Sequence, residues 1–387
     1  MKQILTTYRI PIKLWLDDID PQALEQAKHL AELPCTVEHI AIMPDSHVGY
    51  GMPIGGVMAT RDTVIPNAVG VDIGCGVCAV RTSLRRLEAG SLKRIMSRIR
   101  QAIPLGFKHH DRPQAAALMP VLDDSLMKVV RDQFSRARRQ LGTLGGGNHF
   151  IEIQKGDDGF IWIMIHSGSR NLGHKVASFH NKRAIRLNEQ SGLPVPKSWQ
   201  LAGLPVDSRE ALQYLAEMNF CVLFALANRK LMMQRVQEAM IEVAGSVNFD
   251  KLINNSHNFA AWEEHSGKRI LVHRKGATRA FKDELGLIPG SQGTASYIVR
   301  GKGNPDSFRS CSHGAGRKLG RKQAIRSLDL KKEQQQLDRL GVIHALRRKN
   351  DLDEAPGAYK DIDNVMALQA DLVDIEVRLR PLAVVKG

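Results

Sequence analysis

The sequence contains little cysteine and no long apolar run, and each absence excludes a class of protein. Its five cysteines are scattered over 387 residues, so they do not form the disulfide framework of a small secreted domain. The N-terminal stretch lacks the basic and then apolar pattern of a signal peptide. No apolar run reaches the roughly 18 residues that a membrane-spanning helix needs. We therefore expect a soluble, cytoplasmic protein in a reducing compartment, with no membrane partner.

Tandem repeats, low-complexity linkers and clear breaks are also absent, which predicts one composite domain over residues 1–387. Residues 1–85 alternate short strand-like pieces with glycine turns, and a helix is expected to begin at Asp20 with Pro21 in its first turn. Residues 86–140 are expected to be mostly helical and basic. The later runs "RILVHRKG" and "SYIVRG" read as strands. The fold class is therefore α+β, with mixed sheets surrounded by helices.

A long helix is predicted from Arg209 to Val247. Apolar residues at helical spacing predict its buried face, which consists of Leu212, Leu215, Met218, Val222 and Leu226. The methionines of this segment are interpreted as core residues. After the second strand run, residues 317–350 are predicted to form a charged helical face.

The balance of charge is unusual for a globular protein. Lysine and arginine number 55 against 40 acidic residues, which gives a net charge of +15 and a pI near 9.7. Such an excess indicates a nucleic acid or another phosphate-rich partner. The alternative is that the charge serves only solubility.

A carboxylate and a thiol lie close together in the segment "VGVDIGCGV". Asp72 and Cys75 are flanked by glycines, which weaken strands and usually mark a bend or a close backbone approach. An aspartate oxygen and a cysteine thiolate together suit a borderline divalent ion such as manganese, zinc or iron better than magnesium or calcium. The alternative interpretation is a small buried cysteine beside a capping aspartate.

Three histidines extend this set of candidate ligands. His149 lies in "LGTLGGGNHFIEI", His166 ends "FIWIMIH", which reads as a buried strand, and His257 lies in "NNSHNF". Taken alone, each histidine could be a structural residue held by hydrogen bonds. Together with Asp72 and Cys75, the three could hold two divalent ions if the thiolate bridged them. Two adjacent metal ions would favour phosphoryl or nucleotidyl chemistry.

A second candidate site lies in the segment "SCSHGAGRK". His313 is followed by two glycines, which permit close approach of a large substrate, and by Arg317, which can neutralise phosphate oxygens. His313 is therefore either a nucleophile toward phosphorus or a loop histidine that only binds phosphate. The P-loop motif G-x-x-x-x-G-K-[ST] is absent, so a nucleotide would need another loop. "PGSQG" at residues 289–293 is the candidate.

These segments also carry a family resemblance. "MPDSHVGYG", "VGVDIGCGV", "LGTLGGGNHFIE", "HSGSR", "PGSQG", "SCSHGAGR", "AYKDID" and the terminal "VVKG" occur in an order that resembles the RtcB family of GTP- and manganese-dependent RNA ligases. The resemblance covers nearly the whole chain. It implies a single RtcB-like domain with a central metal and nucleotide cleft. It also implies an enzyme that joins an RNA 3′-phosphate or 2′,3′-cyclic phosphate end to a 5′-hydroxyl end, in RNA repair or tRNA splicing.

Carried over motif by motif, the resemblance implies a role for each candidate residue. Two manganese ions would be bound, with Cys75 bridging them, by Asp72, Cys75, His149, His166 and His257. His313 would be the catalytic nucleophile that accepts GMP, and an RNA 3′-pp-5′G end would follow. Arg170 and Arg317 would contact RNA or nucleotide phosphates. The nucleotide contacts would be Asn148, Glu152, Ser291, His313, Gly314, Tyr359 and Lys386.

Two other classes of function remain open at the level of the sequence. A manganese-dependent phosphodiesterase or phosphatase acting on RNA ends would need the metal ligands but not His313, Glu152 or Lys386. A non-catalytic RNA-binding protein would need the positive charge but no metal cluster. If the chain is a ligase, an accessory activating protein is a further candidate partner, and the segment 106–120 is a candidate RNA contact.

Overall fold

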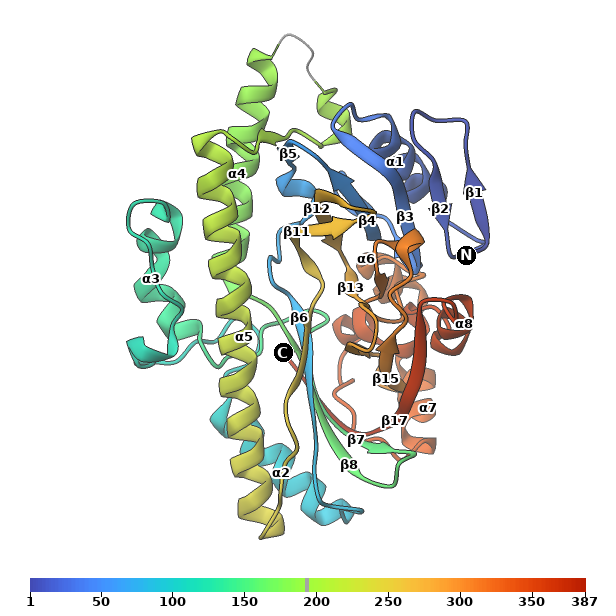
Figure 1. Cartoon of the computed structure of the whole chain (residues 1–387). Helices are drawn as coiled ribbons and strands as arrows, with labels where there is room; N and C mark the ends of the chain where they lie inside the picture. Colours follow the sequence, from blue (N-terminus) through green and yellow to red (C-terminus); the bar gives the residue numbers. More distant parts are fainter. Residues whose placement is uncertain (192–194) are drawn as a thin grey trace.

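The computed structural model describes residues 1–191 and 195–387, and two large β-sheets organise this part of the chain (Figure 1). The first sheet has six strands in the order β1-β2-β3-β4-β12-β11. Their bounds are Gln3–Leu5 (β1), Ile12–Leu14 (β2), Thr36–His47 (β3), Ile54–Thr60 (β4), Lys268–Lys275 (β12) and Asn258–His265 (β11). β2 and β3 pair in parallel and the other neighbours pair antiparallel, so this sheet is mixed, as predicted.

The second sheet has seven strands, all of whose neighbours pair antiparallel, in the order β10-β6-β8-β7-β17-β15-β14. Their bounds are Ile253–Ser256 (β10), Gly76–Arg81 (β6), Ile161–Ser167 (β8), Phe150–Gly156 (β7), Val373–Lys386 (β17), Ser296–Gly301 (β15) and Leu285–Ile288 (β14). Two short ribbons pair β13 (Ala277–Arg279) with β16 (Ser310–Ser312) and β5 (Thr63–Val64) with β9 (Leu204–Pro205).

Helices surround these sheets, which confirms the predicted α+β class. The long helix α5 runs along one side of the molecule and contacts α2, α4 and strand β8 (Figure 1). The helix bounds are Pro21–Glu32 (α1), Ala89–Ala102 (α2), Lys128–Gln140 (α3), Arg170–Gln190 (α4), Arg209–Ala244 (α5), Arg321–Ser327 (α6), Leu330–Arg339 (α7) and Ile362–Leu368 (α8). Within the described residues, no helix combines the length and the apolar character needed to cross a bilayer.

Several local predictions are confirmed in detail. Asp20 is the N-cap of α1, where its carboxylate accepts hydrogen bonds from the backbone N–H groups of Gln22 and Ala23, and Pro21 occupies the first turn. The run that ends at His166 is strand β8, which is buried along its whole length. The prediction that residues 86–140 are mostly helical is confirmed only in part, because α2 and α3 lie at the two ends and the stretch between them is largely irregular.

The predicted buried face of α5 is wrong in part. Met218 is buried, but Leu212 is 51% exposed, and the other three predicted residues are only partly buried. The helix also ends at Ala244, three residues before the predicted Val247. The face that is buried instead carries Ala211, Tyr214, Met218, Cys221 and Ala225.

The buried face of α5 includes polar side chains, which a hydropathy pattern assigns to solvent. Asn228 accepts hydrogen bonds from the backbone N–H groups of Gly142 and Thr143. Arg229 donates from Nη1 to the carbonyl oxygens of Gly74 and Ser167, at 3.0 and 2.8 Å. These hydrogen bonds offset the free-energy cost of removing the polar groups from water. Their partners lie far away in the sequence, so the spacing of apolar residues could not locate the face.

The two large sheets meet where the chain crosses from one to the other at His257. Strand β10 is an edge of the seven-stranded sheet and ends at Ser256, whereas β11 is an edge of the six-stranded sheet and begins at Asn258. The backbone N–H of His257 donates to the carbonyl of Cys75 at 2.9 Å, and its carbonyl accepts from Ala277 at 3.2 Å. Side chains from both sheets therefore converge at this junction.

Candidate active site

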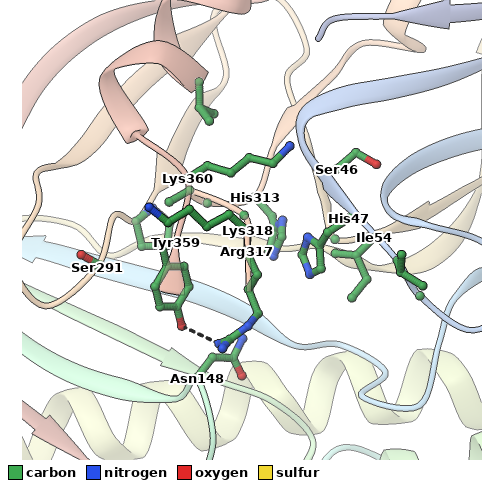
Figure 2. Close-up of a pocket in the computed structure, with 18 of the residues that line it drawn as sticks. Ser46, His47, Ile54, Asn148, Ser291, His313, Arg317, Lys318, Tyr359 and Lys360 are labelled. Atoms are coloured by element: carbon green, nitrogen blue, oxygen red, sulfur yellow. Dashed lines mark hydrogen bonds between the residues drawn. The ribbon is translucent and has the colours of Figure 1, made fainter. Parts of the chain in front are cut away.

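A cleft of about 1240 Å³ opens at the junction of the two sheets. Figure 2 shows His313, His47, Arg317 and Tyr359 in its wall. Most of the predicted site residues line this cleft, namely Asp72, Cys75, Asn148, Glu152, His166, His257, Ser291, His313, Gly314, Arg317, Tyr359 and Lys386. His149 and Arg170 are not part of the lining. The structure thus brings together residues that are spread over more than 300 positions of the chain.

Three predicted metal ligands form a compact group that we call the Cys-His cluster: Cys75, His149 and His166. Their ligand atoms all lie within 4.8 Å of one another, and all three side chains are buried. The Sγ atom of Cys75 lies 3.5 Å from Nε2 of His149 and 3.2 Å from Nε2 of His166. Asp72 adjoins this group, because its Oδ2 lies 3.2 Å from Nε2 of His149.

The backbone fixes the orientation of both histidines in the Cys-His cluster. Nδ1 of His149 lies 3.0 Å from the carbonyl oxygen of Leu144, and Nδ1 of His166 lies 3.2 Å from that of Asn148. Each Nδ1 can therefore donate to a carbonyl, and Nε2 is left with its lone pair toward the thiol. Metal-ligating histidines are commonly held by such a hydrogen bond from the other ring nitrogen.

His257 connects the Cys-His cluster to His313. The ring centroids of His166 and His257 lie 5.2 Å apart, and those of His257 and His313 lie 4.8 Å apart. Burial lowers the pKa of His166 and of His257 well below the ordinary histidine value, so both rings are neutral near pH 7. A neutral imidazole is the form that ligates a metal ion.

The donor set fits a borderline divalent cation. Imidazole nitrogen and thiolate sulfur are ligands that manganese, zinc or iron accept, whereas magnesium and calcium prefer oxygen donors alone. Arg229 lies behind the site with its guanidinium bonded to the carbonyls of Gly74 and Ser167, and it fixes the turn that carries Cys75. Gly74, in that turn, has a φ of 74° and no room for a Cβ against the backbone of Val222.

A buried carboxylate holds His313. Oδ2 of Asp45 lies 2.6 Å from Nδ1 of His313 and also accepts the backbone N–H groups of His313 and Gly314 at 3.0 and 3.3 Å. Burial acts to raise the pKa of Asp45, but the adjacent His313 lowers it below its usual value, so the group is an ionised carboxylate. An ionised carboxylate can only accept, so His313 donates to Asp45 from Nδ1, and this bond fixes the orientation of the ring.

The cleft also contains a set of charged and polar groups around one carboxylate, which we call the Glu354 network: Glu354, Arg317, Arg321, Tyr359 and Lys386. Nζ of Lys386 and Nη1 of Arg321 each lie 2.7 Å from a carboxylate oxygen of Glu354, and Nη1 of Arg317 lies at 3.1 Å. Tyr359 donates its hydroxyl to Glu354 and accepts from Arg317 at 3.3 Å, the contact dashed in Figure 2.

The carboxyl group of Glu354 is ionised although it is buried. Burial acts to raise the pKa of Glu354, but Lys386 and Arg321, together with hydrogen bonds from Lys386 and Tyr359, lower it to about 2. Two arginines and one lysine surround this single carboxylate, so the network carries an excess of positive charge. Such an excess beside a cleft favours an anionic ligand.

Glu152, on β7, is a buried acid with a different environment. Burial raises its pKa to about 8, although Lys386 and a hydrogen bond from Gln154 act in the opposite direction. Nε2 of Gln154 donates to Oε2 of Glu152 at 2.7 Å. An acid that is perturbed in this way and lines a cleft is a candidate for ligand binding.

Comparison with known proteins agrees with this geometry. A family model described as tRNA-splicing ligase RtcB matches residues 26–134 and 120–387. The RNA-splicing ligase RtcB of Escherichia coli is 36% identical over 412 aligned positions, which cover 100% of this chain and 99% of that protein. The chain belongs to the RtcB family. The resemblance inferred from the separated motifs is therefore confirmed.

Relatives in the RtcB family come from all three domains of life. The tRNA-splicing ligase RtcB of Thermococcus kodakarensis is 34% identical, over 98% of this chain and 95% of that protein. The RNA-splicing ligase RtcB homolog 1 of Entamoeba dispar is 33% identical, over 95% of this chain and 82% of that protein.

Some residues at the RtcB cleft were missed among the candidates from the sequence. Asp45 lies in the segment "MPDSHVGYG", and nothing in the sequence pairs it with His313. Glu354 lies five residues before Tyr359 and carries no motif of its own. Lys275 ends β12 and lines the cleft, where burial lowers its pKa to about 7. Its strand "RILVHRKG" was recognised, but a lysine at a strand end is usually solvated.

Arg170 is the predicted phosphate contact that does not line the cleft, although its guanidinium is close enough to Asp72 and Cys75 for their charges to act on its pKa. It opens α4 with a φ of 59°, and its guanidinium donates to Oγ1 of Thr143 at 3.0 Å and to the carbonyl of Gly106 at 2.9 Å. These bonds tie α4 to the loops beside β7. A role for Arg170 in phosphate binding stays a prediction.

Proposed function

We propose that this chain is an RNA ligase that uses GTP and manganese to join an RNA 3′-phosphate or 2′,3′-cyclic phosphate end to a 5′-hydroxyl end, in RNA repair or tRNA splicing in the cytoplasm. The observation that carries the proposal is the position of His313. Its ring adjoins His257 at 4.8 Å on the side of the Cys-His cluster, and its Nδ1 is held by Asp45 at 2.6 Å. The names of the relatives and the net charge of +15 support an RNA substrate.

Five residues would hold two manganese ions: Asp72, Cys75, His149, His166 and His257. When bound, these ions would offset the negative charge that develops on the phosphoryl oxygens during each transfer. The chain contributes the fixed orientation of the imidazoles, through the carbonyls of Leu144 and Asn148.

His313 is the nucleophile in this proposal. Asp45 accepts from Nδ1, so the lone pair on Nε2 is available to attack the α-phosphorus of GTP. The N–P bond forms as the bond to pyrophosphate breaks, and GMP remains on the ring. Asp45 then stabilises the positive charge that develops on the imidazole.

Guanine is selected by Glu152, whose ionised carboxylate accepts from N1–H and from the 2-amino group of the base. Adenine lacks this pair of donors. Asn148, Ser291 and Gly314 supply further contacts from the lining of the cleft. In the Glu354 network, Tyr359 and Lys386 complete the nucleotide site.

The reactions of the RNA ends follow in three steps. A 2′,3′-cyclic end is first hydrolysed to a 3′-phosphate. An oxygen of the 3′-phosphate then attacks the phosphorus of GMP, the P–N bond to His313 breaks, and the RNA ends in 3′-pp-5′G. Finally the 5′-hydroxyl of the second RNA end attacks the 3′-phosphorus and releases GMP. Arg170 and Arg317 are proposed to contact phosphates during these steps.

The test is a search for the covalent adduct. Purified protein is incubated with α-labelled GTP and manganese, and then separated by denaturing electrophoresis. We expect a labelled, acid-labile band that is lost in His313→Ala, while the manganese content is unchanged. His29→Ala is the matched control, because His29 lies on α1 against Trp199 and not in the cleft.

Two results would overturn the proposal. A band of undiminished intensity in His313→Ala would remove the nucleophile from its role. A wild-type protein that binds manganese but forms no adduct and still hydrolyses cyclic phosphate ends would instead be a manganese-dependent phosphodiesterase.

A further inference from the structure

A second groove, of about 830 Å³, runs on from the mouth of the large cleft. Its walls are the loop between β3 and β4, with Val48 and Tyr50, and the helix α6 with the residue before it. Val48, Tyr50 and Arg321 line both the groove and the large cleft. The two hollows are therefore continuous, and a chain that enters the active site can leave along this groove.

One wall of the groove is strongly basic. Helix α6 has the sequence RKQAIRS, with three cationic side chains and no acidic one. Arg321 is bound by Asp353 and Glu354 at 2.8 and 2.7 Å. Lys322 and Arg326 are exposed, and among the described residues neither has a carboxylate within ion-pair distance. Two exposed cations thus line a groove beside a cleft that we propose to handle phosphates.

The other wall presents an aromatic ring to solvent. Tyr50 is 71% exposed, although its backbone is fixed: its carbonyl accepts from Nζ of Lys275 at 2.5 Å and from the backbone N–H of Met52 at 2.9 Å. The ring is therefore accessible, and the backbone that carries it is held in place. An aromatic ring held next to cations is the arrangement that binds single-stranded nucleic acid, because the ring stacks on a base of any identity and the cations contact the backbone.

We infer that this groove binds a single-stranded segment of the RNA substrate, with Tyr50 stacked on one base and with Lys322 and Arg326 at the phosphates. The inference rests on the proposed RNA-ligase function and gives the path of the strand outside the reacting ends. An unpaired strand is required because a base inside a duplex has no free face to offer to Tyr50.

The aromatic contact is tested by the affinity for RNA without GTP, so that ligation is not needed for the measurement. The probe is a fluorescent oligouridylate that ends in a 3′-phosphate, followed by anisotropy. Tyr50→Ala is expected to raise the Kd by roughly 5- to 100-fold, the effect of losing one stacked base. Tyr50→Phe keeps the ring and is expected to bind like the wild type. A Tyr50→Ala protein that binds like Tyr50→Phe would overturn the inference.

The cationic contacts are tested by the dependence of the Kd on salt. The double variant Lys322→Gln with Arg326→Gln is expected to flatten the slope of log K against log salt by about 1.4, since each phosphate contact on a single strand contributes about 0.7. The matched control is Lys331→Gln with Lys332→Gln on α7, which removes the same charge from exposed side chains outside the groove. Equal slopes for the two double variants would overturn the inference.

Two further measurements separate this inference from the proposed function. Formation of the GMP adduct needs no RNA, so the Tyr50 and α6 variants are expected to form it at the wild-type rate. Failure of the adduct in the wild type would refute the proposed function while the binding data still decide the groove. A duplex of the same length that competes as well as the single strand would overturn the single-stranded path.

Discussion

The Cys-His cluster and the Glu354 network face one cleft, but they position their side chains by different means. In the cluster, His166 lies in strand β8, Cys75 and His149 immediately precede β6 and β7, and backbone carbonyls of Leu144 and Asn148 hold the imidazoles. In the network, one buried carboxylate holds four side chains that come from irregular segments, from α6 and from the end of β17. Loss of one ligand should therefore leave the rest of the cluster in place, whereas loss of Glu354 should release the whole network.

The largest effect is expected from Cys75→Ala, which removes the central donor of the cluster. Manganese content should fall, and adduct formation should drop by at least about 100-fold, beyond the effect usual for outer-shell partners. The two histidines are still held by the backbone, so the fold should persist. Metal analysis and the labelled-GTP assay check this. Cys78→Ala is the matched control, because Cys78 is a buried cysteine on β6, three residues after Cys75, and lies outside the cluster. Equal losses in both variants would contradict a specific role for Cys75.

The next effect is expected from Asp45→Asn, which tests the contact between Asp45 and His313. An amide cannot fix the protonated state of Nδ1 as a carboxylate does, so His313 should lose its correct tautomer and its charge stabilisation. Adduct formation is expected to slow by roughly 10²- to 10⁴-fold with manganese content unchanged. Ser46→Ala, at the neighbouring buried position, should have little effect. A normal rate in Asp45→Asn would show that the carboxylate does not act on the nucleophile.

The contrast between the two regions also explains what the sequence could predict. His166 was found because a buried strand has a clear pattern, and Cys75 because glycines mark the turn before β6. These signals are local. The strand registers that bring His149 and His166 together follow from the antiparallel pairing of β7 with β8, which places Phe150 opposite His166.

Contacts between distant segments left no comparable signal. Asp45 and His313 are separated by 268 positions, and only the packing of β3 against β16 brings them together. In the sequence, Glu354 is one acid in a polar segment, and its four partners are brought around it only by the fold. The buried face of α5 was missed for the same reason, because Asn228 and Arg229 are buried only through partners on other elements.

A smaller effect on activity is expected from Glu354→Gln, which tests whether one group holds the nucleotide side. The amide keeps the size of the side chain but removes the carboxylate that pairs with Lys386 and Arg317, whereas Arg321 keeps Asp353 at 2.8 Å. The free energy of unfolding should fall by up to about 3 kcal/mol, the lower end for a broken buried pair, because the side chain of Arg321 is 44% exposed. The Kd for GTP should rise roughly tenfold.

The control for Glu354→Gln is Glu376→Gln, which breaks a surface pair with Arg300 at 2.7 Å. Such exposed pairs contribute at most about 1 kcal/mol. Thermal unfolding and GTP titration measure both variants. If Glu354→Gln were as stable as Glu376→Gln and bound GTP normally, the network would not depend on its central carboxylate.

The smallest effect is a pH dependence of GTP binding that arises from Glu152. Because burial raises the pKa of this acid to about 8, the neutral form predominates below that pH in the free protein. Guanine needs the ionised form as an acceptor, so binding must release a proton there. The affinity should therefore fall as the pH decreases below about 8, by at most tenfold per pH unit, and level off above it. Titrations of GTP binding from pH 7 to pH 9 test this. Glu152→Gln should bind GTP more weakly and should lose the part of the pH dependence that Glu152 causes. Because the variant retains the titration of the GTP phosphates, equal pH profiles in both proteins would assign the dependence to the nucleotide and not to Glu152.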